Sequence, residues 1–126
     1  MRILLFGTFD HLHPGHEFLI REAMKRGSVT VVVARDMNVE RIKGRLPRQS
    51  EGVRKAAIEK KYQEVTVILG DQEDFLAPVR SVYPDLILLG YDQKLPPGIS
   101  EADLRIPVER IPGHETHKWK SSLGRG

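Results

Sequence analysis

The sequence contains no cysteine, and no apolar stretch in it approaches the length of a membrane-spanning helix. The first absence excludes disulfides, thiolate zinc sites and cysteine nucleophiles, and it is compatible with a reducing cytoplasm, where we expect the protein. The chain also begins with the pattern of a strand rather than that of a signal peptide. We therefore expect no membrane partner.

Aromatic residues and net charge are scarce as well. The 126 residues carry a net charge of +3, with an isoelectric point near 9.3, and only 6% of them are aromatic. This length suits one domain, which can bury roughly two-thirds of the surface that its unfolded chain exposes. The slight basic excess favours an anionic ligand. It does not favour nucleic acid, because the basic residues gather in one loop and in the C-terminal tail, where only Trp119 offers an aromatic platform.

What the sequence does contain is an apolar run followed by a stretch rich in glycine and histidine. Residues 2–6 predict a buried strand, Gly7 ends it, and Pro14 suits the first turn of a helix over residues 14–26. The N-terminus of this helix then faces the carboxyl end of the strand. Unpaired N–H groups and the helix dipole make such a junction an anion site.

Two histidines lie at this junction. His13 and His16 are three residues apart across the helix start, so both imidazoles can face one point above the strand end and donate to a phosphate. A helix that only needed an N-cap would carry Ser or Asp here. Two alternatives stay open: surface loop histidines, or a metal site of His11, His13 and His16, although zinc sites usually show a different ligand spacing.

The rest of the chain alternates strand and helix patterns. A β-branched run over residues 29–34 completes a βαβ unit, whose right-handed crossover brings both strand ends to one edge. Further elements are expected as strands at residues 65–69, 85–89 and 107–111, as helices after Ser50 and from residue 75 or 77 to residue 83, and as one or two helical turns within residues 100–105. The predicted fold is α/β, a Rossmann-like single domain over residues 1–126 with a five-stranded, mostly parallel sheet and helices on both faces.

Residues 37–50 lack clear periodicity and are predicted to form a mobile basic loop. Their basic residues are Arg41, Lys43, Arg45 and Arg48. Such a loop would leave the second strand above the phosphate site, where a flexible cation can close over a ligand. A solvated surface loop is the alternative. Gly52, which does not favour helix, predicts that the next helix begins after it.

The string Gly-Thr-Phe-Asp-x-x-His-x-Gly-His over residues 7–16 resembles the signature of the cytidylyltransferase-like nucleotidyltransferases. These small α/β enzymes join a nucleoside monophosphate to a phosphorylated acceptor. The resemblance implies that His13 and His16 contact the nucleotide phosphates and stabilise the pentacovalent transition state. Lys43 matches a lysine that reaches those phosphates, which makes it the third candidate catalytic residue. Other positions of the string are expected to line the nucleotide site: Gly7, Thr8, Phe9, Asp10 and Gly15.

The resemblance covers nearly the whole chain and implies further nucleotide-binding residues. Arg54 matches an arginine used near the active site, although an arginine would also suit an exposed helix face. The residues that leave the fourth strand match a loop beside the nucleoside: Gly90, Tyr91, Asp92 and Gln93. The short basic segment over residues 113–126 matches the part that binds the outer phosphates, through Ser121, Ser122 and Arg125.

Shorter strings narrow the resemblance to one subgroup. Residues 33–36 and 89–93 resemble the archaeal-type FAD synthases. The implied reaction converts ATP and FMN into FAD and pyrophosphate, with Mg²⁺ or another divalent cation held mainly by the triphosphate and helped by Asp10. The alternatives are a CTP-dependent glycerol-3-phosphate cytidylyltransferase and a nucleotide-binding module without turnover. Dimerisation is common in the resembling family, so a homodimer is a further expectation.

Overall fold

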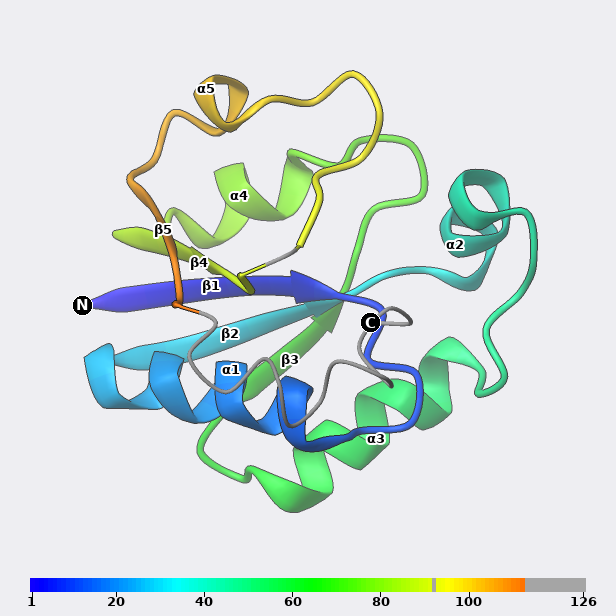
Figure 1. The fold of residues 1–126 in the computed structure, drawn as a ribbon, viewed down its shortest axis with the longest axis horizontal. Coiled ribbons are helices and arrows are strands. Elements are labelled where there is room, and N and C mark those ends of the chain that lie inside the picture. Colours follow the sequence, from blue (N-terminus) through cyan, green and yellow to red (C-terminus); the bar gives the residue numbers. More distant parts are fainter. Residues whose placement is uncertain (92, 113–126) are drawn as a thin grey trace.

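The computed structural model describes residues 1–91 and 93–112, in which five strands form one sheet (Figure 1). The strands are β1 (Arg2–Gly7), β2 (Ser28–Val33), β3 (Thr66–Leu69), β4 (Leu86–Leu89) and β5 (Val108–Arg110). Their order in space is β3-β2-β1-β4-β5, and each neighbouring pair is parallel. The predicted α/β, Rossmann-like class with a five-stranded parallel sheet is confirmed.

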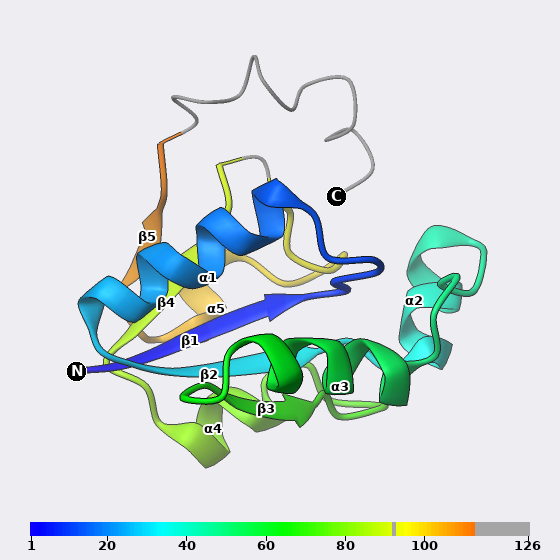
Figure 2. The ribbon, with the colours of Figure 1, turned by 90° about the horizontal axis from the view of Figure 1, so that it is seen from below.

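Helices cover both faces of this sheet, as predicted. Helices α1 (Pro14–Arg26) and α3 (Glu51–Lys61) lie on one face, whereas the shorter α4 (Ala77–Val82) and α5 (Glu101–Leu104) lie on the other (Figure 1). Figure 2 views the molecule from the side of α1 and α3. Across the described ranges, no helix is long and apolar enough to cross a membrane.

The central strand β1 shows why these residues form a strand that is covered on both faces. Ile3 and Leu5 belong to the apolar cluster under α1 and α3, while Leu4 and Phe6 belong to the cluster under α4 and α5. Successive side chains of a strand point to opposite faces, so a strand with helices on both sides must be apolar at every position. The continuous apolar run at the start of the sequence is therefore the signature of the middle of the sheet.

The strand order also fixes where a ligand can bind. From β1 the chain first adds β2 and β3 on one side, and then crosses to add β4 and β5 on the other. A crevice forms where the connections from β1 and β4 part in opposite directions, and open α/β sheets bind ligands there. Figure 1 shows helix α2 (Asp36–Lys43) beyond the strand ends, on the side to which the arrows point.

Helix α2 corrects the prediction of a loop over residues 37–50. The first half of that segment is helical, and Gly44 ends the helix with φ of 82°, a left-handed conformation that glycine adopts without strain. Only Val39 is buried within α2, whereas Met37 and Ile42 are exposed. The helix therefore lacks the broad apolar stripe by which helices are recognised in a sequence.

The start of α3 corrects a second expectation. The helix begins at Glu51, directly after Ser50, whose hydroxyl accepts a hydrogen bond from the N–H of Val53 at 3.3 Å. Gly52 does not delay it, because the carboxylate of Glu51 is anchored outside the helix. Its oxygens accept from the N–H of Asp36 at 2.8 Å and from Nη1 of Arg35 at 3.2 Å. Contacts distant in sequence therefore outweigh the low helix propensity of glycine.

Candidate active site

The two predicted catalytic histidines lie against each other at the start of α1. Their imidazole rings are stacked, with centroids 3.7 Å apart and an interplanar angle of 22°. His13 is the N-cap of the helix, and its Nδ1 accepts a hydrogen bond from the N–H of Gly15 at 3.1 Å. An imidazole thus takes the capping role that Ser or Asp usually fills. The cap fixes the orientation of the His13 ring, and stacking fixes that of His16.

Phe9 packs against His16. Its side chain is buried, and its ring meets that of His16 edge-on, with centroids 5.2 Å apart and an angle of 63°. The backbone of Phe9 is left-handed, with φ of 53°, which turns the chain sharply after β1. A Cβ atom at Gly7 would lie 2.6 Å from Cε2 of Phe9, closer than real contacts allow. The glycine of the signature is therefore needed for the aromatic support of His16.

Both imidazoles are neutral at pH 7. Burial, followed by the proximity of His13 and the positive charge of Lys43, lowers the pKa of His16 from 6.5 to about 4. Burial likewise lowers the pKa of His13 below its ordinary value. Because Nδ1 of His13 accepts the hydrogen bond of the cap, the proton of this neutral ring is on Nε2. His13 therefore offers one N–H donor without carrying a charge.

Two ring nitrogens of this pair have no hydrogen-bond partner among the described residues. Nε2 of His13 and Nδ1 of His16 are both buried and unpaired. Leaving a buried polar atom unsatisfied costs about 1–3 kcal/mol, so such atoms gather where a ligand supplies the missing partner. The oxygens of a phosphate would accept the N–H of His13, and the helix dipole at the start of α1 favours the same anion.

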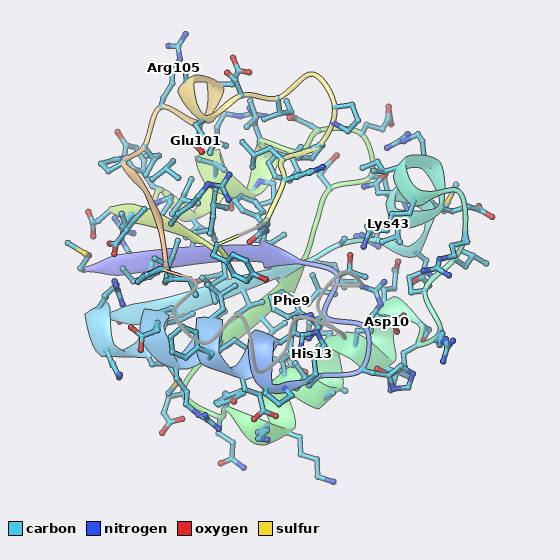
Figure 3. All side chains as sticks on the ribbon, in the orientation of Figure 1. Phe9, Asp10, His13, Lys43, Glu101 and Arg105 are labelled. Carbon is cyan, nitrogen blue, oxygen red and sulfur yellow. The ribbon has the colours of Figure 1, made fainter. Side chains whose placement is uncertain are left out.

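Lys43 brings a cation to the same strand end. It is the last residue of α2, and its Nζ lies 3.4 Å from Oγ1 of Thr8. Figure 3 shows Phe9, Asp10, His13 and Lys43 at the end of the sheet toward which β1 points, whereas Glu101 and Arg105 lie on the side of α5. The predicted cation therefore reaches the signature from a helix end and not from a loop.

A cleft of about 1150 Å³ opens at this edge and connects the two histidines with the loop after β4. The sequence-predicted residues that line it are Gly7, Thr8, Phe9, His13, Gly15, His16, Lys43, Gly90, Tyr91 and Gln93. Residues from the first strand, two helices and the β4 loop thus meet in one cavity. Most of the described residues that the sequence assigned to the site are brought together there.

Gln93 lines the cleft, but its amide is occupied by the protein. Nε2 donates to the carbonyl oxygen of Phe6 at 2.8 Å, and Oε1 accepts from the N–H of Gly90 at 3.0 Å. Nη1 of Arg110 donates to the carbonyl oxygens of Gly90 at 3.0 Å and of Gln93 at 2.6 Å. The side chain predicted to bind the nucleotide therefore ties the β4 loop to the end of β1.

Asp10 belongs to the signature but does not line the cleft. Its carboxylate oxygens accept the backbone N–H groups of Arg48 and Gln49, each at 2.9 Å. Partial burial alone would raise the pKa of this carboxyl, but the two backbone hydrogen bonds hold it below its ordinary value. The Asp10 carboxylate thus fastens the segment that precedes α3 to the signature.

Arg54 also lies outside the cleft wall, and its side chain is fully buried. The alternative of an exposed helix face is therefore wrong. The guanidinium donates to the carbonyl oxygen of Thr8 at 2.8 Å, to that of Gln49 at 3.0 Å and to Oδ1 of Asp36 at 2.6 Å. Arg54 therefore contacts the signature through its backbone and holds the turn after β1 in place.

The described ranges contain no group of three or more His, Asp or Glu side chains that could hold a metal ion. The alternative of a site built from His11, His13 and His16 is thus not formed there. Four predicted site residues lie outside the described residues: Asp92, Ser121, Ser122 and Arg125.

Sequence reasoning missed the far wall of the cleft. Asn38 and Arg41 of α2 line it, and they tie the helix to the segment after β3. Nδ2 of Asn38 donates to the carbonyl oxygen of Asp71 at 2.9 Å, and Arg41 donates to Oδ1 of Asn38 and to the carbonyl oxygen of Gln72. Recognising α2 from its apolar positions Val39 and Ile42 would have placed both side chains beside Lys43.

Comparisons with known proteins identify the family of this chain. A family model described as cytidylyltransferase-like matches residues 4–114, and the chain belongs to that family. It is 44% identical to the FAD synthase of Aciduliprofundum boonei over 95 residues, which are 75% of this chain and 63% of that protein. It is 37% identical to the FAD synthase of Methanospirillum hungatei over 131 positions, covering 97% of this chain and 81% of that protein. The resemblance to archaeal-type FAD synthases is confirmed.

A solved structure shares the fold over nearly its whole length. It is described as a lipopolysaccharide core biosynthesis protein from Thermoplasma volcanium, and the TM-score is 0.77 at 36% identity. The match covers 89% of this chain and 96% of that one. The names of these relatives, FAD synthase and lipopolysaccharide core biosynthesis protein, differ in the product that they imply. The shared fold alone therefore does not identify the acceptor.

Proposed function

We propose that this protein is an FMN adenylyltransferase, which makes FAD and pyrophosphate from ATP and FMN. The observation that carries the proposal is the stacked, neutral pair of His13 and His16, whose ring nitrogens include two without a described partner. The pair lies at the carboxyl ends of the strands and lines a cleft large enough for two substrates. The similarity to FAD synthases of two archaea supports the identity of the acceptor.

In the proposed reaction, the α phosphate of ATP lies at His13 and His16. A phosphate oxygen of FMN attacks the α phosphorus, a new P–O bond forms, and the bond between that phosphorus and the oxygen bridging to the β phosphate breaks. Pyrophosphate leaves with the electron pair of the broken bond. Such a transfer needs positioning and charge stabilisation more than it needs a protein base. This fits a site in which no free carboxylate lies among the described residues beside the two histidines.

The outgoing pyrophosphate requires cations and donors beyond the two histidines. Lys43 supplies one cation, because it lines the cleft and its ammonium lies beside Thr8. Ser121, Ser122 and Arg125 complete the set in this proposal, as the family resemblance implies. The nucleoside lies along the β4 loop at Gly90 and Tyr91, and Asp92 is a further nucleotide contact that the family resemblance implies.

A divalent cation such as Mg²⁺ is part of the proposal, with the triphosphate oxygens as its main ligands. It would neutralise charge on the phosphates. The contribution of Asp10 to this ion is not favoured, because both of its oxygens already accept backbone hydrogen bonds. The described residues contain no cluster of acidic side chains that could hold a metal ion.

A screen of four nucleoside triphosphates against FMN and glycerol 3-phosphate, with pyrophosphate release as the readout, tests the proposal. We expect ATP and FMN to be the only productive pair. Release from CTP and glycerol 3-phosphate alone would instead establish the cytidylyltransferase alternative. Tight nucleotide binding without pyrophosphate from any pair would establish a binding module.

The proposed enzyme works in the cytoplasm as a homodimer, without a nucleic-acid or membrane partner. Sedimentation equilibrium of the purified chain tests the homodimer, and a monomer at micromolar concentration would contradict it.

A further inference from the structure

The cleft contains an apolar part that the phosphate chemistry does not use. Besides the residues at the histidines, its wall includes apolar side chains from the α4 and α5 face of the sheet. We call this part the apolar lobe; its residues are Phe6, Val32, Phe75, Leu95 and Ile99. They come from β1, from β2 and from the segments that follow β3 and β4. The lobe thus lies on the opposite face of the sheet from α1.

Phe75 gives this lobe a flat aromatic wall. Its ring stacks on that of Phe6, with centroids 4.6 Å apart and an interplanar angle of 27°. Phe6 is almost completely buried in the sheet, whereas Phe75 is only partly buried and lines the cleft. The fixed ring of Phe6 therefore sets the orientation in which Phe75 meets the cleft.

Polar side chains line the same cleft. Asn38 and Arg41 reach the cleft from α2, Asp71 and Glu73 from the segment after β3, and Lys94 from the segment after β4. A cleft that combines an apolar lobe with polar side chains suits a ligand whose ring is apolar on its faces and polar at its edges.

We propose that the apolar lobe binds the planar ring system of the acceptor and that Phe75 is its main stacking contact. The inference rests on the proposed function and adds the substrate class that the lobe selects: a phosphorylated acceptor that carries a planar heteroaromatic ring, such as a flavin. A polyol phosphate would gain nothing from these walls, because placing hydroxyl groups against Phe75 and Leu95 would cost hydrogen bonds to water.

The place of the nucleoside supports giving the lobe to the acceptor. The nucleoside and the attacking acceptor both meet at the α phosphorus during transfer, so each needs its own part of the cleft. The loop at Gly90 and Tyr91, on the proposed nucleoside side, meets the cleft beside Phe18 and Ile111 of the other apolar cluster. Once the nucleoside occupies that side, the apolar lobe is the large apolar surface of the cleft that remains for the acceptor.

The decisive measurement is equilibrium binding of three probes to the wild type and to Phe75→Ala. FMN carries ring and phosphate, riboflavin carries the ring alone, and glycerol 3-phosphate carries the phosphate alone. We expect Phe75→Ala to weaken FMN and riboflavin by the same factor, about tenfold or more, from lost stacking and lost apolar contact. Binding of glycerol 3-phosphate and of ATP should change by less than about twofold.

Tyr83→Ala provides the matched control. Tyr83 follows α4, as Phe75 precedes it, but its side chain is 71% exposed and does not line the cleft. Its removal should leave all three probes unchanged. If Phe75→Ala fails to fold, which loss of ATP binding would reveal, Leu95→Ala tests the same lobe from a different segment and should weaken both flavins severalfold.

The inference and the proposed function fail in different ways. If Phe75→Ala and Leu95→Ala bind FMN as the wild type does, the lobe assignment is overturned, even if ATP and FMN yield pyrophosphate. The same holds if these variants bind ATP more weakly while their FMN binding is unchanged. Flavin binding that depends on Phe75 without pyrophosphate release supports the lobe and refutes the adenylyltransferase. A wild-type protein that binds neither flavin overturns the inference.

Discussion

The two ends of the signature stretch differ in what their side chains contact. At the helix end, His13 and His16 line the cleft and hold ring nitrogens without a described partner. At the strand end, the carboxylate of Asp10 points to the backbone N–H groups of Arg48 and Gln49, and Arg54 holds the carbonyl oxygen of Thr8. We refer to Asp10 and Arg54 as the brace.

The difference shows that a family signature mixes two kinds of residue. In the proposed function the histidines contact a ligand, whereas the brace positions the turn from which the histidines are presented. Loss of a histidine should therefore reduce turnover with little change in stability. Loss of a brace residue should reduce the free energy of unfolding first, and activity only through the displaced turn.

The largest effect should come from Arg54→Ala. This change removes a fully buried guanidinium and leaves the Asp36 carboxylate and two carbonyl oxygens without their donor. We expect the free energy of unfolding to fall by about 3–5 kcal/mol, measured by urea titration. Lys55→Ala, on the next residue of α3 and in a surface pair with Glu59, should cost less than about 0.5 kcal/mol. An equally small loss in Arg54→Ala would remove Arg54 from the brace.

His16→Ala should show the opposite pattern. Removing one group that stabilises the transition state lowers kcat by about 10²- to 10³-fold. The thermal unfolding curve should keep its cooperativity. His11→Ala is the matched control from the same stretch, because that histidine is exposed, and it should retain wild-type turnover. Near-normal kcat in His16→Ala would contradict the assigned role.

The two ends should also respond differently to pH. The pKa of His16 is about 4 in the folded protein and 6.5 ordinarily, so the unfolded chain binds more protons between these values. The stability contribution of neutral His16 is complete above pH 6.5 and is lost as the pH falls toward 4, by no more than about 3 kcal/mol. Urea titrations of the wild type and His16→Ala at pH 7 and pH 4.5 measure it. If the free energy of unfolding fell by the same amount between pH 7 and pH 4.5 in both proteins, this prediction would be contradicted.

The smallest effect should come from Asp10→Asn. The amide oxygen keeps part of the hydrogen bonding to Arg48 and Gln49, so the free energy of unfolding should fall by about 1–2 kcal/mol. If Asp10 acts only in the brace, the Mg²⁺ concentration for half-maximal activity stays within about twofold of the wild-type value. A tenfold rise in that concentration would make Asp10 a metal ligand and remove it from the comparison.

Much of the fold was predictable, because its strands are continuous apolar runs and α1 has a clear apolar face. The histidines were predictable from their spacing behind β1. Helix α2 was not, since only Val39 within it is buried. The burial of Arg54 and the stacking of Phe75 on Phe6 depend on partners distant in sequence, and an apolar residue in a connecting segment carries no sign that it lines a cleft.

The central place of β1 has a consequence for how the chain acquires its structure. This strand pairs with β2 soon after it in sequence, but its other edge is covered only by Leu86–Leu89 of β4. During synthesis, the edge beside the histidine signature therefore stays open until most of the chain has been made. Non-local parallel pairing is slow, and open edges attract other strands. Truncation before β4 should consequently yield a chain that aggregates, while closure of the sheet and completion of the cleft occur in the same step.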